Sequence, residues 1–495
     1  MRLFLFIIMC SVLGCEDSAP GVAGVATCEQ NTTICRTDQV CEPQGTRGYV
    51  CVDMTDPDSS YPPLEDAAQP YDSTTTVIDS GAIDAFVADT LETDVLSVDS
   101  SITDGGGIRI LDSAVEADMR MADAAIGPRE RCTVLVGRAV NDIFGASVKL
   151  NRSGDRLVVG AYQQLGDVRL AGYVRAYGRT GDEWAQMGDD INGMADGHGA
   201  GYSTAMSADG DRVVIGSPIA DDYTGLARVF QLNNGSWEQM GATIQAVRAG
   251  SQFGGAVAMN ADGDRIAVGW TDNLASASYV QLYDWQGGAW ATVGDVVQVP
   301  GFRGLTSGAL SFNDAGNRLS VGLIGSVAGN GGTQIFQLSD GVWTPMGDIV
   351  QSGLDGLDQF GYCTSLNAAG DRVAIGARFD STAAAQAGAL RIYEWNGATW
   401  IQLGDSLLGM EFGQLGQSCE LSDQGDRVVS GQPNGAGFVQ AYVWQDDQWD
   451  HLGEQITDDR GGNLGHAVAI SGDGQYVVGG GPLAAENYVT VCRVP

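Results

Sequence analysis

The stretch MSADGDRVVIGSP, residues 206–218, decides the fold because near copies of it recur along the chain. Its polar centre has the composition of a tight turn, and the apolar run after it is typical of a buried strand. The chain contains seven such copies, and they recur about every 53 residues, a period in the range of β-propeller blades. In successive copies the turn glycine is followed by Asp155, Asp211, Asp264, Asn317, Asp371, Asp426 and Gln475.

Each repeat reads as four strands. An alternating segment such as ASVKL precedes the turn, RLVVGA follows it, and GYVRAYG and EWAQMG come third and fourth. Four strands separated by turn signals are typical of a propeller blade. The sequence therefore predicts an all-β fold with a seven-bladed β-propeller over residues 131–495. A tryptophan recurs on the fourth strand, where we expect it to pack between blades: Trp184, Trp237, Trp290, Trp343, Trp400 and Trp449.

The seventh repeat ends after its third strand, at ENYVTVCRVP. Residues 134–137, which precede the first repeat, can supply the missing fourth strand and so hide the open sheet edges. This closure would place Cys132 beside the strand that carries Cys492, and it predicts a disulfide between them. Cys363 and Cys419 lie on the first strands of adjacent repeats. We expect a bridge between blades there, with buried free thiols or a catalytic cysteine as the alternatives.

The repeats resemble FG-GAP repeats, the blades of integrin-α-type propellers, over about the last 360 residues. The resemblance lies in the Phe-Gly pairs at 144–145, 253–254 and 360–361 and in the VGA or IGS endings. In many such repeats the inner turn is an Asp-rich calcium loop. Here, in AMSADGDRV, only Asp209, Gly210 and Asp211 match that loop. We therefore expect no metal in these turns and no other cofactor.

The N-terminus, MRLFLFIIMCSVLGC, has one basic residue and a short apolar run, the pattern of a secretory signal. A membrane span needs roughly 20 apolar residues. Residues 12–15 resemble the bacterial lipobox, which implies a lipoprotein signal peptide over 1–14, a lipid on Cys15 and a tether over 15–27. A plain signal peptide is the alternative. The protein is expected in the cell envelope, anchored by lipid at the outer membrane or cell surface, with the periplasmic face as the other option.

Without Cys10 and Cys15, eight of the ten cysteines remain, an even number suited to disulfides in an oxidising compartment. A disulfide-rich module is predicted over 28–52, with two disulfides whose pairing is open. A zinc site is disfavoured because the segment contains no Cys-x-x-Cys pair. Residues 53–130 are rich in Asp, Glu, Ser, Thr and Ala and are predicted to be a disordered acidic linker. The four module cysteines are Cys28, Cys35, Cys41 and Cys51.

The formal net charge of −36 excludes nucleic acid as a partner, since phosphate binding needs clustered Lys and Arg. Lys149 is the only lysine, which disfavours covalent lysine chemistry. The sequence contains no Gly-x-Ser-x-Gly, His-Glu-x-x-His or Gly-Lys-Ser/Thr motif. We expect a monomer anchored to a membrane only through its lipid.

In a propeller the loops between second and third strands and the connections between blades open on one face, where binding tends to lie. The candidate binding residues in these segments are His198, Asp221, Asp222, Tyr223, Asp272 and Asp380, the Asp and Tyr residues being expected to be exposed. We expect a membrane-anchored protein that binds a protein or glycan ligand through these loops. The alternatives are an envelope scaffold and a periplasmic or surface hydrolase or lyase. An enzyme would bring His198 and pocket carboxylates together near the propeller axis.

Overall fold

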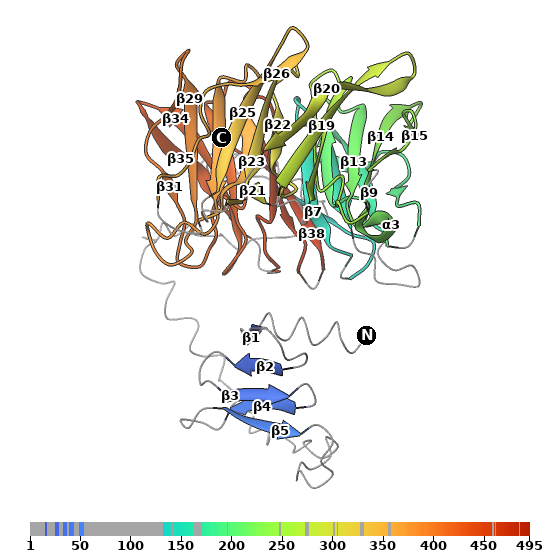
Figure 1. Cartoon of the computed structure of the whole chain (residues 1–495). Helices are drawn as coiled ribbons and strands as arrows, with labels where there is room; N and C mark the ends of the chain where they lie inside the picture. The colour runs from blue at the N-terminus through green and yellow to red at the C-terminus, as the bar shows by residue number, and fades with distance from the viewer. Residues whose placement is uncertain are drawn as a thin grey trace, which may run out of the picture. The chain divides into compact units, whose positions relative to one another are not determined.

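The computed structural model describes residues 132–495, apart from short gaps of which the longest covers 163–170, and five short strands between residues 15 and 53. The chain divides into two units, Met1–Arg109 and Ile110–Pro495. The second unit contains the propeller (Figure 1). Among the described residues no helix is long and apolar enough to cross a membrane.

The first unit contains two small sheets. One has the order β1 (Cys15–Glu16), β2 (Val25–Cys28) and β3 (Thr33–Arg36). The other pairs β4 (Gln39–Pro43) with β5 (Tyr49–Asp53), with Cys41 opposite Cys51 in the register. The side chains of this unit, the signal peptide and the acidic linker lie outside the described residues. The two module disulfides, the lipid on Cys15 and the disorder of the linker therefore stay predictions.

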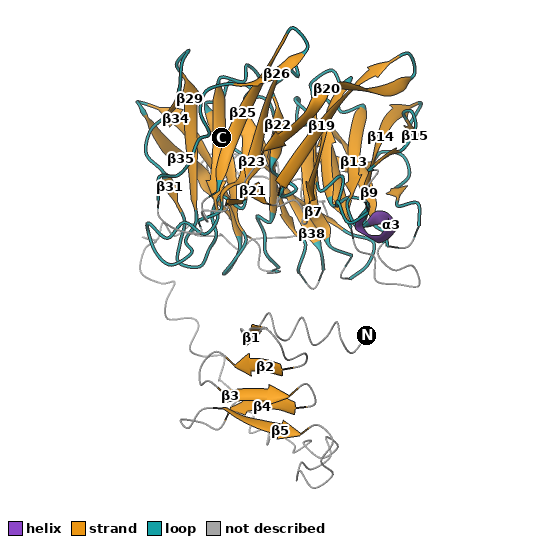
Figure 2. Cartoon of the chain, in the orientation of Figure 1, coloured by secondary structure: helices purple, strands orange, loops and turns teal. Residues whose placement is uncertain are grey.

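Seven antiparallel sheets of four main strands form the ring, one for each sequence repeat (Figure 2). From the axis outward, blades 1 and 2 consist of β7 (Phe144–Leu150), β8 (Arg156–Ala161), β9 (Tyr173–Thr180) and β10 (Glu183–Gln186), and of β12 (Ser203–Met206), β13 (Arg212–Ser217), β14 (Leu226–Asn233) and β15 (Ser236–Gln239). Blades 3 and 4 consist of β17 (Ala256–Met259), β18 (Arg265–Asp272), β19 (Ala277–Gln286) and β20 (Ala289–Val299), and of β22 (Leu310–Phe312), β23 (Arg318–Leu323), β25 (Gly332–Ser339) and β26 (Val342–Pro345).

Blades 5 to 7 follow the same plan. They consist of β27 (Phe360–Leu366), β28 (Arg372–Ala377), β29 (Ala389–Trp395) and β30 (Trp400–Gln402); of β32 (Ser418–Leu421), β33 (Arg427–Gln432), β34 (Phe438–Gln445) and β35 (Gln448–Thr457); and of β36 (Ala467–Ile470), β37 (Tyr476–Gly481), β38 (Tyr488–Arg493) and β6 (Cys132–Val136). Short extra strands β11 (Ile191–Asn192), β16 (Ile244–Gln245) and β31 (Leu407–Leu408) pair with third strands, and β21 (Phe302–Arg303) pairs with β24 (Gly325–Ser326).

The predicted closure of the ring is confirmed. β6 pairs antiparallel with β38 and places Cys132 opposite Cys492. A disulfide joins them, with their Cα atoms 4.1 Å apart. The first strand of the described propeller is therefore also the outer strand of its last blade, so the last blade has all four strands.

The GDR part of the repeated stretch performs two structural tasks. Its glycine adopts the left-handed conformation that the turn requires, for example φ 73° at Gly210. Its arginine reaches the turn of the next blade. Arg265 Nη1 donates to the carbonyl of Gly316 at 2.9 Å, and Arg318 Nη1 donates to that of Gly370 at 3.0 Å. The repeated segment therefore forms a turn, begins the second strand, and supplies a hydrogen bond to the next blade.

The inner turns also form a closed ring of seven backbone hydrogen bonds around the axis. One N–H in each turn donates to a carbonyl in the next, at 2.8 to 3.1 Å, and the seventh returns to the first. No side chain takes part in these bonds, and every blade is tied to both neighbours. The residues of the ring, in order, are Arg152, Ala208, Ala261, Asp314, Ala368, Asp423 and Gly472.

The recurrent tryptophans pack between blades, as predicted. The indole N–H of four of them donates to a carbonyl of the preceding blade. Trp237 bonds to Met187 at 2.9 Å, and Trp400 bonds to Met346 at 2.9 Å. The same contact joins Trp290 to Met240 and Trp449 to Leu403.

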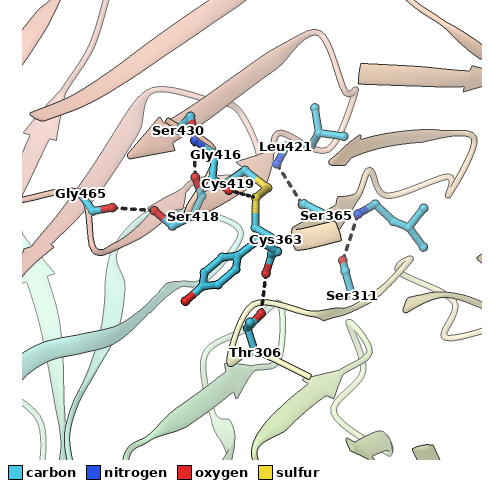
Figure 3. The surroundings of a disulfide bond; sticks show 12 residues. Thr306, Ser311, Cys363, Ser365, Gly416, Ser418, Cys419, Leu421, Ser430 and Gly465 are labelled. Atoms are coloured by element: carbon cyan, nitrogen blue, oxygen red, sulfur yellow. Dashed lines mark hydrogen bonds between the residues drawn. A yellow bond between two sulfur atoms is a disulfide. The ribbon is translucent and has the colours of Figure 1, made fainter. Parts of the chain in front are cut away.

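Cys363 on β27 and Cys419 on β32 form the predicted disulfide between blades 5 and 6 (Figure 3). Cys363 occupies the position that Ser147, Ser203 and Ser418 hold in other blades. Those three hydroxyls donate to a glycine carbonyl of the next blade, at 2.8 to 2.9 Å. In blade 5 a covalent bond therefore joins the blades where others use a hydrogen bond.

Candidate functional site

The propeller axis ends on two faces of different character. The inner-turn face carries the turns between first and second strands. The loop face carries the loops between second and third strands and the connections between blades. Its one-turn helix α3 (Ala220–Tyr223) marks the lower edge of the propeller in Figure 1.

At the inner-turn end the axis holds a cavity of about 150 Å³ that charged side chains cross. Lys149 Nζ lies 2.6 Å from Glu420 Oε1. Nearer the surface, Arg152 pairs with Asp423 at 2.8 Å and also with Asp314. Burial, and to a lesser degree Asp314, raises the pKa of Asp423, while Arg152 opposes the shift. Two cations thus neutralise most of the three carboxylates, and the backbone ring surrounds them.

At the loop-face end the axis is lined by the residue that follows the glycine of the Phe-Gly pair, or the residue aligned with it (Ser307 in blade 4), in each repeat. Three blades have a small residue there, and four have a large polar or aromatic one. In chain order these residues are Ala146, Tyr202, Gly255, Gly308, Tyr362, Gln417 and His466. Two residues that follow second strands, Tyr162 and Arg378, add to the group. We call Tyr162, Tyr202, Tyr362, Arg378, Gln417 and His466 the axial mouth.

The side chains of the axial mouth contact one another in pairs. The rings of Tyr162 and Tyr202 meet edge to face, with their centroids 5.2 Å apart. The guanidinium carbon of Arg378 lies 4.0 Å from the centroid of the Tyr362 ring, a cation–π geometry. Gln417 Nε2 lies 2.9 Å from His466 Nδ1. All six residues except the buried Gln417 are half-buried.

Burial also shifts the pKa values of side chains in the axial mouth. Burial, followed by Tyr362 and Tyr162, raises the pKa of Tyr202 to about 12. Burial, followed by Arg378, lowers the pKa of His466 to about 4. At pH 7 the tyrosines are therefore protonated and His466 is neutral. Arg378 is the one charged side chain of the axial mouth.

A smaller cleft of about 80 Å³ adjoins the axial mouth at Tyr202. It lies between blades 2 and 3, and polar and apolar atoms contribute about equally to its wall. Trp270, which lines it, also stacks on Tyr279 with centroids 5.3 Å apart. The cleft-lining residues are Tyr202, Pro218, Ile219, Gln252, Gly255, Trp270, Thr271 and Leu305.

The structure brings together two of the residues predicted from the sequence. His198 Nε2 lies 3.8 Å from Asp221 Oδ1, although His198 itself is buried. Asp222 and Tyr223 are exposed beside them, and Asp221, Asp222 and Tyr223 all have φ between 50° and 62°. Three consecutive left-handed residues other than glycine are a strained backbone.

The exposure predicted for Asp380 is wrong. This carboxylate is fully buried and pairs with Arg391 Nη2 at 2.6 Å. Its pKa is lowered: burial acts to raise it, but hydrogen bonds from Thr382 and Arg391 and the charge of Arg391 outweigh burial. Asp380 therefore stabilises blade 5 instead of facing a ligand. Asp272 ends β18, and its side chain lies outside the described residues.

His198 does not join the carboxylates of the axis. Glu420, Asp314 and Asp423 lie at the inner-turn end, where Lys149 and Arg152 neutralise them. Within the described part of the chain no group of three or more His, Cys, Asp or Glu residues could hold a metal ion. The convergence expected of a hydrolase or lyase is thus not found in the residues that the structure describes.

The axial mouth was missed by sequence reasoning, although a signal was present. In the repeat alignment the residue after the Phe-Gly glycine is glycine or alanine in three blades. Tyr202, Tyr362, Gln417 and His466 depart from that preference. Because this position starts the innermost strand, large residues there face the axis, and the departure could have been noticed.

The fold and site define a seven-bladed β-propeller that carries a cluster of half-buried aromatic and polar side chains at the loop-face end of its axis. No model of a known protein family matches the sequence, and no curated protein does. Among solved structures the chain is similar to Kuenenia stuttgartiensis hydrazine synthase, with 11% identity and a TM-score of 0.49 over 72% of this chain and 97% of that one. It is also similar to the WD40 repeats of RRP9, with 11% identity and a TM-score of 0.46 over 74% of this chain and 100% of that one. A chain of the mitotic checkpoint complex is similar too, with 14% identity and a TM-score of 0.48 over 73% of this chain and 95% of that one.

Proposed function

We propose that the chain is an exported, lipid-anchored binding protein with an FG-GAP-like propeller, which recognises a protein or glycan ligand at the cell envelope. One observation carries the binding part of this proposal, namely the difference between the two ends of the axis. The inner-turn end is surrounded by the backbone ring and crossed by ion pairs. The loop-face end presents half-buried tyrosines, an arginine and a neutral histidine.

Such a composition suits recognition. Ligand sites are concave and combine aromatic surface with a few oriented polar groups. The axial mouth has the aromatic surface and the polar groups, and the small cleft at Tyr202 adjoins it. Export and lipid anchoring are supported by the signal-like N-terminus and by the propeller disulfides, which suit an oxidising compartment.

Two measurements test the proposal. Protease treatment of intact cells, followed by an immunoblot for the propeller and a lysed control, tests its exposure. Loss of the propeller from intact cells supports recognition at the surface, whereas protection until lysis favours a periplasmic scaffold or enzyme. The full-length protein is then applied to a glycan array and to intact cells, beside a Tyr202→Ala, Tyr362→Ala variant. Binding that this double variant retains contradicts the assignment to the axial mouth.

A further inference from the structure

Arg378 differs from several other arginines of this chain in its partners, although Arg228 likewise pairs with no carboxylate among the described residues. The sequence has 62 acidic residues against 26 basic ones. Several other arginines pair with a carboxylate, as Arg175 does with Asp190 at 2.7 Å and Arg391 does with Asp380 at 2.6 Å. Arg378 has no carboxylate within ion-pair distance among the described residues.

Neutral groups surround Arg378 instead. Its guanidinium lies on the rings of Tyr362 and Phe379, at 4.0 and 4.5 Å from their centroids. Its Nε–H donates to the amide oxygen of Gln359 at 2.6 Å. Burial lowers the pKa of Arg378, and Tyr362 partly opposes this shift.

The hydrogen-bonding capacity of Arg378 is only partly used. Gln359 occupies the Nε–H, and no hydrogen bond within the described residues occupies the four N–H groups of the two Nη atoms. Two parallel N–H groups of a guanidinium match the two oxygens of a carboxylate. A half-buried guanidinium held flat by two aromatic rings is therefore oriented for an external carboxylate.

The other members of the axial mouth suit a ligand rich in hydroxyl groups. Tyr162, Tyr202 and Tyr362 offer ring faces and phenolic hydroxyls, an apolar body with a polar tip. The amide of Gln417 and the neutral imidazole of His466 can each both donate and accept hydrogen bonds. Sugar rings present apolar C–H faces and a rim of hydroxyls, so they complement both features. A peptide tail would bring a carboxylate, but it would leave most of these polar groups unpaired.

We propose that the axial mouth binds an acidic saccharide, with Arg378 pairing with a carboxylate of the sugar and the tyrosine rings packing on its faces. This inference rests on the proposed binding function and narrows its ligand to one chemical class. The saccharide approaches from the loop face, along the axis. On the side of blades 3 and 4 the corresponding positions are the glycines Gly255 and Gly308, which add no side chain to the axial mouth.

Titration calorimetry of the full-length protein tests this inference. The probes are oligogalacturonate and its fully methyl-esterified form, which has similar rings without the charge, together with alginate oligosaccharides and a peptide with a free C-terminal carboxylate. We expect an acidic oligosaccharide to bind at least about tenfold more tightly than its neutral counterpart. Arg378→Gln should abolish this preference.

Arg493→Gln is the matched control. Arg493 is exposed and contacts Gln475 of an inner turn, on the face opposite to the axial mouth, so the variant removes one charge without touching the site. It should keep the affinity and the preference of the wild type. Thermal unfolding of both variants checks that the propeller remains folded.

Several results would overturn the inference: equal binding of acid and ester, a preference that Arg378→Gln retains, binding of the peptide alone, or no binding of any acidic oligosaccharide. None of these results decides the proposed function. That function is tested by exposure of the propeller on cells and by loss of binding in the tyrosine variant, and neither test depends on a preference for acidic sugars. A protein that binds only neutral glycans through the axial mouth would retain the proposed function and lose this inference.

Discussion

Cys132 and Cys492 face each other on β6 and β38, and their disulfide joins the first strand of the propeller to the last. The bridge closes a loop with a sequence separation of 360 residues, whereas Cys363 and Cys419 are 56 residues apart. Cross-linking a longer loop removes more conformational entropy from the unfolded chain.

The first prediction compares these two bridges. We expect Cys132→Ala with Cys492→Ala to lower the free energy of unfolding by roughly 6 kcal/mol, about 1.6 kcal/mol more than removal of the second bridge. For the second bridge, Cys363→Ser with Cys419→Val uses residues that sister blades hold at these positions, so that only the cross-link is lost. Denaturant unfolding measures both. Equal losses would show that loop length does not decide the effect.

The second prediction concerns the indole N–H groups. Trp400 Nε1 donates to Met346, whereas Trp343 Nε1 is buried and has no hydrogen-bond partner in the described structure. Replacement by Phe removes similar apolar area at both sites. We expect Trp400→Phe to destabilise the propeller by about 1 kcal/mol more than Trp343→Phe, because only the former loses a hydrogen bond. Thermal or denaturant unfolding of the two variants measures the difference, and the reverse order would contradict it.

The third prediction concerns pH. The pKa of His466 is about 4 in the folded protein and 6.5 for an unperturbed histidine. The unfolded state therefore binds the proton more readily between these values, and stability falls as the pH drops from 6.5 to 4, by up to about 3 kcal/mol. His466→Gln introduces the residue that blade 6 has at this position. Urea unfolding from pH 4 to 7 should show a weaker pH dependence in the variant, and identical slopes would refute the shift.

The fourth prediction tests the lipid anchor. If Cys15 carries acyl chains, Cys15→Ser should move the full-length protein from the membrane fraction to the soluble fraction and abolish its labelling by a radioactive fatty acid. Cys10→Ser, inside the expected signal peptide, should leave both unchanged. Labelling that persists in Cys15→Ser would disprove lipidation at this residue.

Much of the architecture was predictable because the repeats carry it. A turn glycine such as Gly210 specifies a left-handed residue, and seven copies give the number of blades. The Cys132–Cys492 disulfide followed from the closure of the ring, and the Cys363–Cys419 disulfide from aligning the repeats, which puts these cysteines one position apart on the first strands of neighbouring blades. The burial of Asp380 was not predictable. It depends on Arg391, which reaches it from β29 only after the blade has folded.

The binding site was less visible in the sequence than the fold. His198 and Asp221 are in different blade segments, and only the fold brings them to 3.8 Å. Tyr202 and Tyr362 look like ordinary strand residues until their ring of seven positions is placed around one axis. Pattern reasoning finds what the repeats share, whereas this site consists of the positions at which they differ.

The backbone ring of the inner turns has a consequence for how such a sequence can change over time. Because main-chain atoms alone make its seven hydrogen bonds, the side chains at these positions are released from holding the blades together. Alanine, glycine, aspartate and arginine all occur there. One repeat can therefore acquire a charge at the axis while its sister repeats keep a methyl group, so duplicated blades can diverge in chemistry without loss of the common frame.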